Sequence, residues 1–227
     1  MNFFTADIHF CDEFTMKSDN RPFKSVKAYD KFTIKQWNKV AKTGDTIYVA
    51  GDLLDCDGEN SYEWKQGLEL IKKIKAGVIL ILGNNEQRVI KLFFNNDFDA
   101  FVKVCKIHGI KEVYKSLDIE LAGKKFHITH QIKDGKKNMI NLFGHTHLCS
   151  GIYHPYGLCI SCDLNHFRLF TLDMILAYLE RKTNYWEPDE NCNYINPFLK
   201  EINGEIINIK LKKNRAYKDY LQSNRFD

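Results

Sequence analysis

The chain has 227 residues, of which 44% are hydrophobic and 13% aromatic, enough for one buried core with a terminal appendage. Its 33 basic and 29 acidic side chains give a net charge of +4. That charge suits an anionic substrate but is too small for a protein that coats nucleic acid. No apolar run approaches the roughly 20 residues of a membrane span, and the opening residues lack the basic flank of a signal peptide. We therefore expect a cytoplasmic protein with no membrane partner.

The seven cysteines indicate reduced thiols, because their number is odd and no export signal accompanies them. Cys159 and Cys162 form a C-x-x-C pair inside a run that is typical of a strand. Residues three apart in a strand face opposite sides, and the chain has no second pair to complete a zinc site. We expect both thiols to be part of the core.

Short apolar runs alternate with helical patterns in the first two-thirds of the chain, as in an α/β sheet. A helix is predicted to begin after Ser25, its cap, and to end at Gly44. A second helix is predicted from the capping box at 60–63 to Gly77. Strands are predicted over 2–6, 46–50 and 78–82, the last apolar throughout, as a strand covered on both faces should be.

The second half of the chain begins with a helical pattern over 87–107, which is broken at 95–97. Little helix separates the strand candidates that follow, so a second, mainly antiparallel sheet is expected, and then a helix over 172–182. The composition changes after this helix, so we divide the chain into a domain of residues 1–182 and a C-terminal extension of residues 183–227. The strand candidates are 117–121, 125–129, 139–143, 158–162 and 167–171.

A polar cluster follows each of the three early strands. Ligand sites in open α/β sheets lie outside the carboxyl ends of strands, so these clusters are expected to converge. His130 and a Gly-His-Thr-His run follow two later apolar runs. On an extended backbone, both side chains of Asp-x-His or His-x-His face the same way. The clusters are Asp7-Ile8-His9, Gly51-Asp52-Leu53, Gly83-Asn84-Asn85-Glu86, His130 and Gly144-His145-Thr146-His147.

These residue types fit divalent metal ions, since imidazole and carboxylate suit zinc, manganese, iron or nickel, and a carboxylate can bridge two ions. The absence of cysteine from the clusters argues against a structural zinc site. Gly51, Gly83 and Gly144 suit turns where the backbone approaches the ions closely. A single histidine such as His130 is more often structural than a ligand, and it is the ordered set that carries the prediction.

This ordered set resembles the signature of the calcineurin-like metallophosphoesterase superfamily, and more narrowly its small prokaryotic and phage-type members. Three further segments match the sequences of these members: the opening residues 3–10, Arg21-Pro22-Phe23 and Cys162-Asp163-Leu164-Asn165. The resemblance covers roughly residues 1–180. It implies an α/β fold in which two β-sheets form a sandwich flanked by helices, in four α/β/β/α layers.

The resemblance also implies a binuclear centre of two divalent ions, with manganese first and nickel, zinc, iron or magnesium as alternatives. Asp7, His9 and His147 would bind the first ion, Asn84, His130 and His145 the second, and Asp52 would bridge them. His127 is a rival to His130, but it lies inside its strand rather than at the strand's end.

Asn85 departs from the family pattern, which has a histidine over the scissile phosphate at this place. An asparagine can donate a hydrogen bond but cannot deliver a proton at neutral pH. The departure indicates either a change of substrate or a site without activity. Because all the expected ligands remain, we favour a change of substrate.

The predicted function is hydrolysis of a small-molecule or nucleotide phosphate ester, first of all a phosphodiester, by a hydroxide shared between the two ions. Asp52 and Asn85 are the predicted catalytic residues. Arg21 is the predicted phosphate contact and Arg88 the second choice, because guanidinium matches phosphate geometry, although a single loop arginine usually faces solvent. Two alternatives stay open, a nuclease that acts on a nucleic-acid polymer and a metal-binding interaction scaffold without catalysis. The ester and the oligomeric state are left open.

Overall fold

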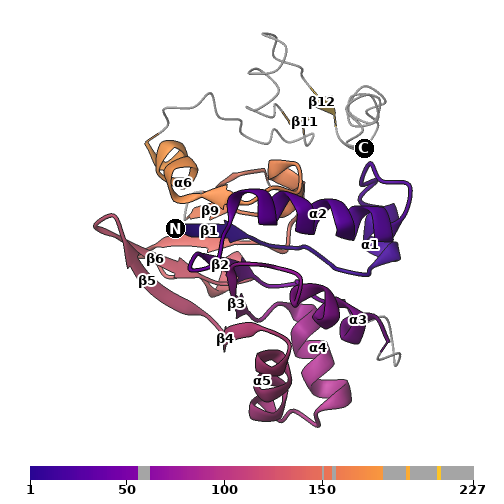
Figure 1. Cartoon of the computed structure of the whole chain (residues 1–227). Helices are drawn as coiled ribbons and strands as arrows, with labels where there is room; N and C mark the ends of the chain where they lie inside the picture. The colour runs from indigo at the N-terminus through magenta and orange to yellow at the C-terminus, as the bar shows by residue number, and fades with distance from the viewer. Residues whose placement is uncertain (56–61, 150, 155–156, 181–192, 195–208, 211–227) are drawn as a thin grey trace.

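The computed structural model describes residues 1–55, 62–149, 151–154, 157–180, 193–194 and 209–210. Within these ranges the chain forms two five-stranded sheets and a separate two-stranded pair (Figure 1). That pair joins β11 (Asn193–Tyr194) to β12 (Ile209–Lys210) in antiparallel orientation. Most of the expected extension lies outside the described residues, so the division of the chain at residue 182 stays a prediction.

The first sheet has the order β10-β1-β2-β3-β4, with β1 to β4 parallel and β10 antiparallel to β1. The three early strands were predicted to within one residue at each end. β4 was not predicted, because Lys111 and Glu112 interrupt its apolar pattern, as befits a strand at the edge of a sheet. The strands are β1 (Asn2–Thr5), β2 (Thr46–Ala50), β3 (Gly77–Ile81), β4 (Ile110–Tyr114) and β10 (Phe170–Thr171).

The second sheet has the order β5-β6-β7-β9-β8, and it is mixed rather than mainly antiparallel. The β6–β7 and β7–β9 pairs are parallel, because the chain crosses back between those strands instead of turning in a hairpin. The expected strand over 167–171 is reduced to β10, which joins the first sheet. The strands are β5 (Leu117–Leu121), β6 (Lys124–Ile128), β7 (Ile140–Phe143), β8 (Tyr153–His154) and β9 (Gly157–Cys159).

The first helix was not predicted, and the others begin within three residues of their predicted starts. Three of these end earlier than predicted, including the one expected over 172–182, which ends at Leu179. The Ser25 hydroxyl caps α2 (Val26–Val40) by accepting from the Ala28 N–H at 3.2 Å. That helix ends at Val40, and Gly44 (φ +94°) lies in the turn beyond it. The next helix, α3 (Tyr62–Ile71), ends before Gly77, and residues 60–61 of its expected cap lie outside the described residues. The helices are α1 (Glu13–Ser18), α2 (Val26–Val40), α3 (Tyr62–Ile71), α4 (Asn84–Phe93), α5 (Phe98–Ile107) and α6 (Leu172–Leu179).

The C-x-x-C thiols are buried and free, as expected, although only Cys159 is in a strand. The strand stops there because a short 3₁₀ turn, η2 (Cys162–Asn165), begins three residues later. A second such turn, η1 (Ile132–Asp134), lies between β6 and β7. Among the described residues, none of the helices has the length and apolarity to cross a bilayer.

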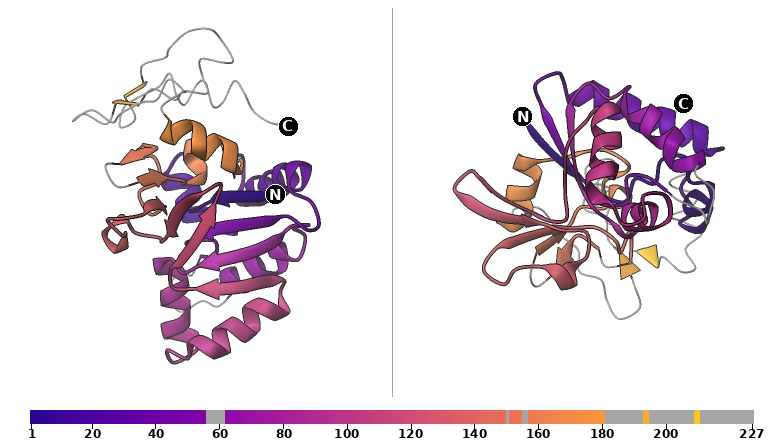
Figure 2. Two further views of the ribbon diagram at one scale, coloured as in Figure 1. Left: turned by 90° about the vertical axis from the view of Figure 1, so that its left-hand side faces the viewer. Right: turned by 90° about the horizontal axis from the view of Figure 1, so that it is seen from below.

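Alternate residues of the first sheet face two cores. Phe3, Ile47 and Val78 are in register and pack with the buried faces of α2 to α5. The neighbouring Phe4 and Ile81 pack instead with residues of β6, β7, β9 and α6. The second sheet therefore lies on the side of the first sheet opposite α2 to α5 (Figure 2). The predicted fold of two sheets flanked by helices is confirmed.

Candidate metal centre

The loops after β1, β2 and β3 meet at the carboxyl edge of the first sheet. The Asp7 N–H donates to the Gly51 carbonyl at 3.1 Å, and the His9 N–H donates to the Asp52 carbonyl at 2.9 Å. These bonds continue the β1–β2 pairing past the ends of the strands and fix the two loops against each other. The polar clusters therefore converge where the sequence predicted, as expected for an open α/β sheet.

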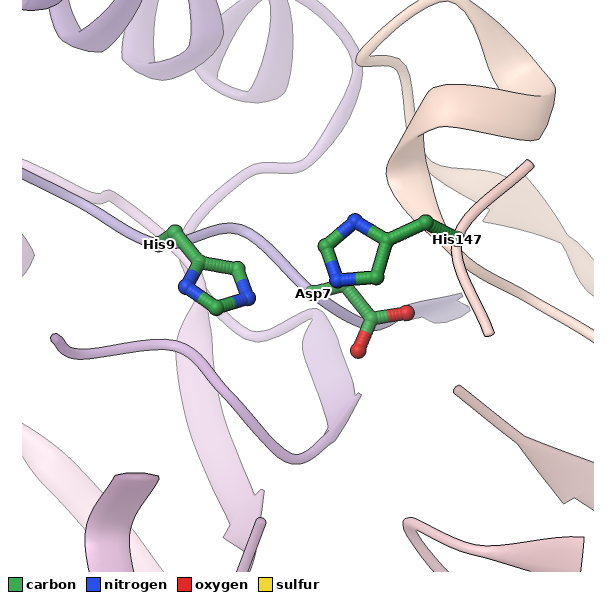
Figure 3. Close-up of side chains that lie close together, drawn as sticks. All are labelled: Asp7, His9 and His147. Atoms are coloured by element: carbon green, nitrogen blue, oxygen red, sulfur yellow. The ribbon is translucent and has the colours of Figure 1, made fainter. Parts of the chain in front are cut away.

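Asp7, His9 and His147 form one group, which we call the first half-site. Each offers a ligand atom within 4.8 Å of the others. The imidazoles of His9 and His147 lie with their ring centroids 5.2 Å apart. Figure 3 shows both rings next to the Asp7 carboxylate, although His147 comes from a loop far away in the sequence. This arrangement leaves donor atoms of all three side chains around one point.

Asn84, His130 and His145 lie together in what we call the second half-site. The Asn84 Oδ1 atom is 2.9 Å from His130 Nε2 and 3.0 Å from His145 Nδ1. Asp52 lies between the half-sites, with Oδ2 at 3.3 Å from His130 Nε2 and 3.8 Å from His9 Nε2. One carboxylate oxygen of Asp52 therefore lies near an imidazole of each half-site.

The backbone at these residues differs from the extended conformation that the sequence suggested. Asp7, His9, Asp52, His145 and His147 all have φ between +48° and +72°. L-residues adopt this left-handed region rarely, and residues held there cluster at functional sites. The side chains of Asp-x-His and His-x-His still converge, but the cause is a repeated left-handed turn after the strand.

The three glycines of the clusters leave room for the ligands. A Cβ at Gly144 would lie 2.8 Å from Asp7 Oδ2, and a Cβ at Gly83 would overlap the Asp52 carboxylate. A Cβ at Gly51 would overlap the ring of His130, and Gly51 also has φ +84°. Close approach of the backbone to the site therefore requires glycine, as predicted.

Fixed acceptors hold the outer nitrogens of three histidines. His9 Nδ1 lies 3.1 Å from Asp12 Oδ2, and His130 Nδ1 lies 2.9 Å from the Ala50 carbonyl oxygen. His147 Nδ1 lies 2.8 Å from Asp19 Oδ2 and 3.2 Å from Asp163 Oδ2. A proton on each Nδ1 leaves Nε2 with a lone pair for a metal ion, which is the usual arrangement of a metal-binding histidine.

Two further groups of potential ligand atoms lie behind His9 and His147. They are His9 with Asp12 and Asp55, and His147 with Asp19 and Asp163. Asp12 accepts from the Thr15 N–H at 2.7 Å, and both Asp163 oxygens accept from Arg21. These oxygens are already used, so we interpret the two groups as supports for His9 and His147 rather than as separate ion sites.

The residues of the centre fit divalent cations. Asp7 Oδ2 and His9 Nε2 are buried and have no hydrogen-bond partner within the described part of the chain. Burial opposes protonation of His130, but the carboxylates of Asp52 and Asp7 raise its pKa to about 9. Burial acts likewise on His147, whose pKa Asp163, Asp19 and Asp7 raise to about 11. Both shifts report a negative potential that favours a bound cation.

Residues 3–146, more than half of the chain, match the model of the family described as calcineurin-like phosphoesterase. The chain belongs to this family. The sequence-based prediction of a metal-dependent phosphoesterase is thereby confirmed. Calcineurin-like phosphoesterases depend on divalent metal ions, in agreement with the two groups of candidate ligands.

An uncharacterised protein of Methanocaldococcus jannaschii is 31% identical over 185 residues, which are 78% of this chain and 89% of that protein. Among solved structures, a protein of unknown function from Aquifex aeolicus has a TM-score of 0.54 at 18% identity, with 78% of this chain and 98% of that chain covered. It shares the fold. A novel archaeal phosphodiesterase has a TM-score of 0.39 at 16% identity and covers 71% of this chain and 84% of its own, which is too loose a likeness to carry an argument.

Within this calcineurin-like phosphoesterase, Arg21 is not placed to contact a phosphate. Its side chain is only 1% exposed. Nε and Nη2 donate to the two Asp163 oxygens, Nη1 donates to the Ile8 carbonyl and the Tyr29 hydroxyl, and Nη2 also donates to the Asp7 carbonyl. All five N–H groups of a guanidinium are thus used inside the protein. The proposed phosphate contact is corrected on this ground.

Arg88 is exposed on α4, one helical turn after Asn84, and its role as a phosphate contact stays a prediction. His127, the rival to His130, is on β6 with Nδ1 at 2.6 Å from Asp118 Oδ1, and it is not part of the groups of donor atoms at the centre. The structure thus groups His130 and not His127 with the other candidate ligands, and its role as a metal ligand stays a prediction.

Asn85 lies at the start of α4 against the first half-site. Its N–H donates to Asp52 Oδ1 at 3.0 Å, and its side-chain Nδ2 donates to Asp55 Oδ1 at 3.2 Å. Nδ2 is also 3.3 Å from His9 Nδ1. The amide is therefore held next to the centre as a hydrogen-bond donor.

Sequence reasoning missed the role of Glu86. Its buried carboxylate accepts from the N–H groups of Asp52, Leu53, Leu54 and Gly83, at 2.8 to 3.0 Å. It thereby ties the loop after β2 to the start of α4. The spacing of Gly83 and Glu86, which is that of a helix cap and its third residue, was the available signal.

Proposed function

We propose that this protein is a phosphodiesterase that hydrolyses a small-molecule or nucleotide ester with two divalent ions, manganese first. The observation that supports it is the Asp52 carboxylate between two groups of candidate metal-ligand atoms. Asp7, His9 and His147 would hold one ion and Asn84, His130 and His145 the other, with Asp52 shared. When bound, such ions supply an activated water nucleophile and neutralise charge on the phosphate.

The protein's own residues orient this chemistry. Nδ1 of His9 and of His147 faces carboxylates, so each ring presents Nε2 to the centre in a fixed direction. The Asn85 amide, held by Asp55, can donate a hydrogen bond to a phosphate oxygen or a leaving oxygen. It cannot release a proton at neutral pH. An ester whose leaving group needs no proton is therefore the better substrate, which favours diesters with good leaving groups over alkyl monoesters.

The test is a metal-by-substrate screen on the purified full chain. A monoester, a diester, cyclic nucleotides and short oligonucleotides are assayed with manganese, nickel, zinc, iron and magnesium. We expect turnover of the diester or a cyclic nucleotide to be highest and to require metal. A preference for the monoester would contradict the proposal. Oligonucleotide cleavage that falls steeply with salt would identify a nuclease, because a polymer releases many counterions on binding. Metal binding without turnover of any ester would identify a scaffold.

A further inference from the structure

Arg21 reaches the first half-site by two routes, although it can contact neither an ion nor a substrate. One route goes through the backbone carbonyls of Asp7 and Ile8, and the other goes through the Asp163 carboxylate to His147. Every acceptor of the guanidinium other than the Tyr29 hydroxyl belongs to one of these routes. The side chain is therefore built into the support of the centre.

The backbone route fixes the left-handed turn that follows β1. Arg21 Nη2 donates to the Asp7 carbonyl at 2.7 Å, and Nη1 donates to the Ile8 carbonyl at 2.8 Å. Asp7 and His9, on either side of Ile8, have φ of +59° and +53°. A conformation that L-residues rarely adopt persists only where its surroundings hold it. Two bonds to consecutive carbonyls hold this one.

The side-chain route fixes the ring of His147. Arg21 binds Asp163 in a two-pronged arrangement, with Nε to Oδ1 at 3.0 Å and Nη2 to Oδ2 at 2.8 Å. Asp163 Oδ2 then lies 3.2 Å from His147 Nδ1. A carboxylate held in this way has one orientation, and together with Asp19 Oδ2, which lies 2.8 Å from the same Nδ1, it orients the imidazole.

A lysine could not replace this arginine. The planar guanidinium carries five N–H donors in a fixed fork, whereas an ammonium carries three around one point. Arg21 Cζ also lies 5.0 Å from the ring centroid of Tyr29 and 5.6 Å from that of Phe167, so aromatic faces pack around the fork. The acceptors around Arg21 therefore match the planar guanidinium of arginine and not the compact ammonium group of lysine.

We propose that Arg21 is a positioning residue for the first half-site, so that the ion held by Asp7, His9 and His147 depends on it. The ion held by Asn84, His130 and His145 depends on it less, because His130 Nδ1 is held by the Ala50 carbonyl and Asn84 lies outside both routes, and the contact of this half-site with them is the His145 N–H that donates to Asp7 Oδ1 at 2.8 Å. The inference rests on the proposed two-ion function. It assigns Arg21 to the assembly of one half of the centre and not to the substrate.

The experiment is a calorimetric titration of the metal-free full chain with Mn²⁺. Two reference variants identify the binding steps, His147→Ala for the first half-site and Asn84→Ala for the second. Arg21→Lys should weaken the step that His147→Ala abolishes by roughly tenfold to hundredfold, the usual effect of losing a partner behind a metal ligand. The step that depends on Asn84 should weaken several-fold less, since the side chains of His130 and Asn84 are held outside both routes.

A second variant guards against loss of folding, because Arg21→Lys leaves Asp163 imperfectly paired. The double change Arg21→Met with Asp163→Leu removes both buried charges together, which proteins tolerate better than removal of one. It should fold, as judged by circular dichroism, and lose the same binding step. Ile175→Val is the matched control, since Ile175 is fully buried on α6 in the other core and its truncation lowers stability without touching either route.

Equal weakening of both steps, or no change in either Arg21 variant, would overturn the inference. So would a normal Mn²⁺ titration of Arg21→Lys combined with a raised KM for the ester, the result expected of a phosphate contact. The proposed function fails separately. Wild-type protein with a single Mn²⁺ step contradicts the two-ion proposal, and Arg21 is then judged on whether its variants weaken that step as His147→Ala does.

Discussion

The two half-sites differ in depth and in support. Asp7 and His9 of the first are 0% and 5% exposed, whereas Asn84 and His145 of the second are at the surface. Nδ1 of His9 and of His147 faces carboxylate oxygens at 3.1 and 3.2 Å, whereas His130 Nδ1 faces the Ala50 carbonyl oxygen at 2.9 Å and the Asp7 carboxylate is 3.8 Å away. Two of the three side chains of the first half-site are therefore buried, whereas two of the three side chains of the second half-site lie at the surface.

This difference indicates that the two proposed ions are bound with different affinities. A site whose ligands are fixed in advance binds its ion more tightly, because less ordering is needed on binding. Ligands at the surface can adjust when a substrate arrives. We therefore expect the first ion to be a permanent part of the protein and the second to exchange, with the substrate entering over the second half-site.

Removing the shared carboxylate should erase the distinction between the halves. Asp52→Ala takes away the group that lies between His9 and His130, so each of the two proposed ions would lose a ligand. We expect turnover to fall to a few per cent or less, on the order of the hundredfold losses seen when a central electrostatic group is removed. Steady-state assays with saturating Mn²⁺ measure this. A variant that keeps more activity would show that Asp52 is not the bridge.

Asn85 lies between the two half-sites, since it is on the same helix as Asn84 and its side chain is next to His9 of the first half-site. Asn85→His restores a group able to deliver a proton. It should raise turnover of esters with poor leaving groups by up to roughly hundredfold and that of activated esters less. A leaving-group series assayed on both proteins gives the two slopes. Parallel slopes would make Asn85 a spacer or a substrate contact, and inactivity of both proteins would favour the scaffold interpretation.

The order of ion binding tests the comparison directly. Mn²⁺ should bind in two steps that differ by roughly tenfold or more, given the effect of outer partners on affinity. Dialysis against a weak chelator should remove one ion first, and elemental analysis should then find one Mn²⁺ per chain. Asn84→Ala should eliminate the ion that leaves first. If His147→Ala eliminates it instead, our assignment of the tighter half-site is wrong.

The smallest effect concerns the turn that carries Asp163. His166 follows this turn with φ +51°, and burial, with help from Arg168, lowers its pKa from 6.5 to about 4. Because the unfolded chain takes up this proton at a higher pH than the folded chain does, stability begins to fall as the pH drops through 6.5 and continues to fall toward pH 4. At pH 5.5 the loss should be about 1 kcal/mol.

His166→Asn is the matched variant, since asparagine tolerates left-handed backbone and does not titrate. Urea unfolding at pH 7 and pH 5.5 should show a smaller pH dependence in this variant than in the wild type. Equal losses in both proteins would mean that His166 is protonated in the folded state.

The sequence indicated the fold from local patterns. Buried strands such as β2 consist of apolar runs bounded by turn residues, and the Ser25 cap marked the start of α2. It failed where long-range pairing decides the structure. β10 is only two residues long and owes its place to β1, and the parallel pairing of β6 with β7 depends on a crossover that no local pattern encodes.

For the candidate centre, the sequence by itself determined which side chains to consider, because ligand chemistry and the ends of strands are both local properties. Only the tertiary structure decided how they are held. The left-handed turns at Asp7 and His9, the carboxylate of Glu86 that ties two loops together, and the Arg21–Asp163 pair all join residues far apart in the sequence. Arg21 shows the reason most clearly, since a guanidinium is equally suited to a phosphate and to a carboxylate, and only its burial determines which of them it meets.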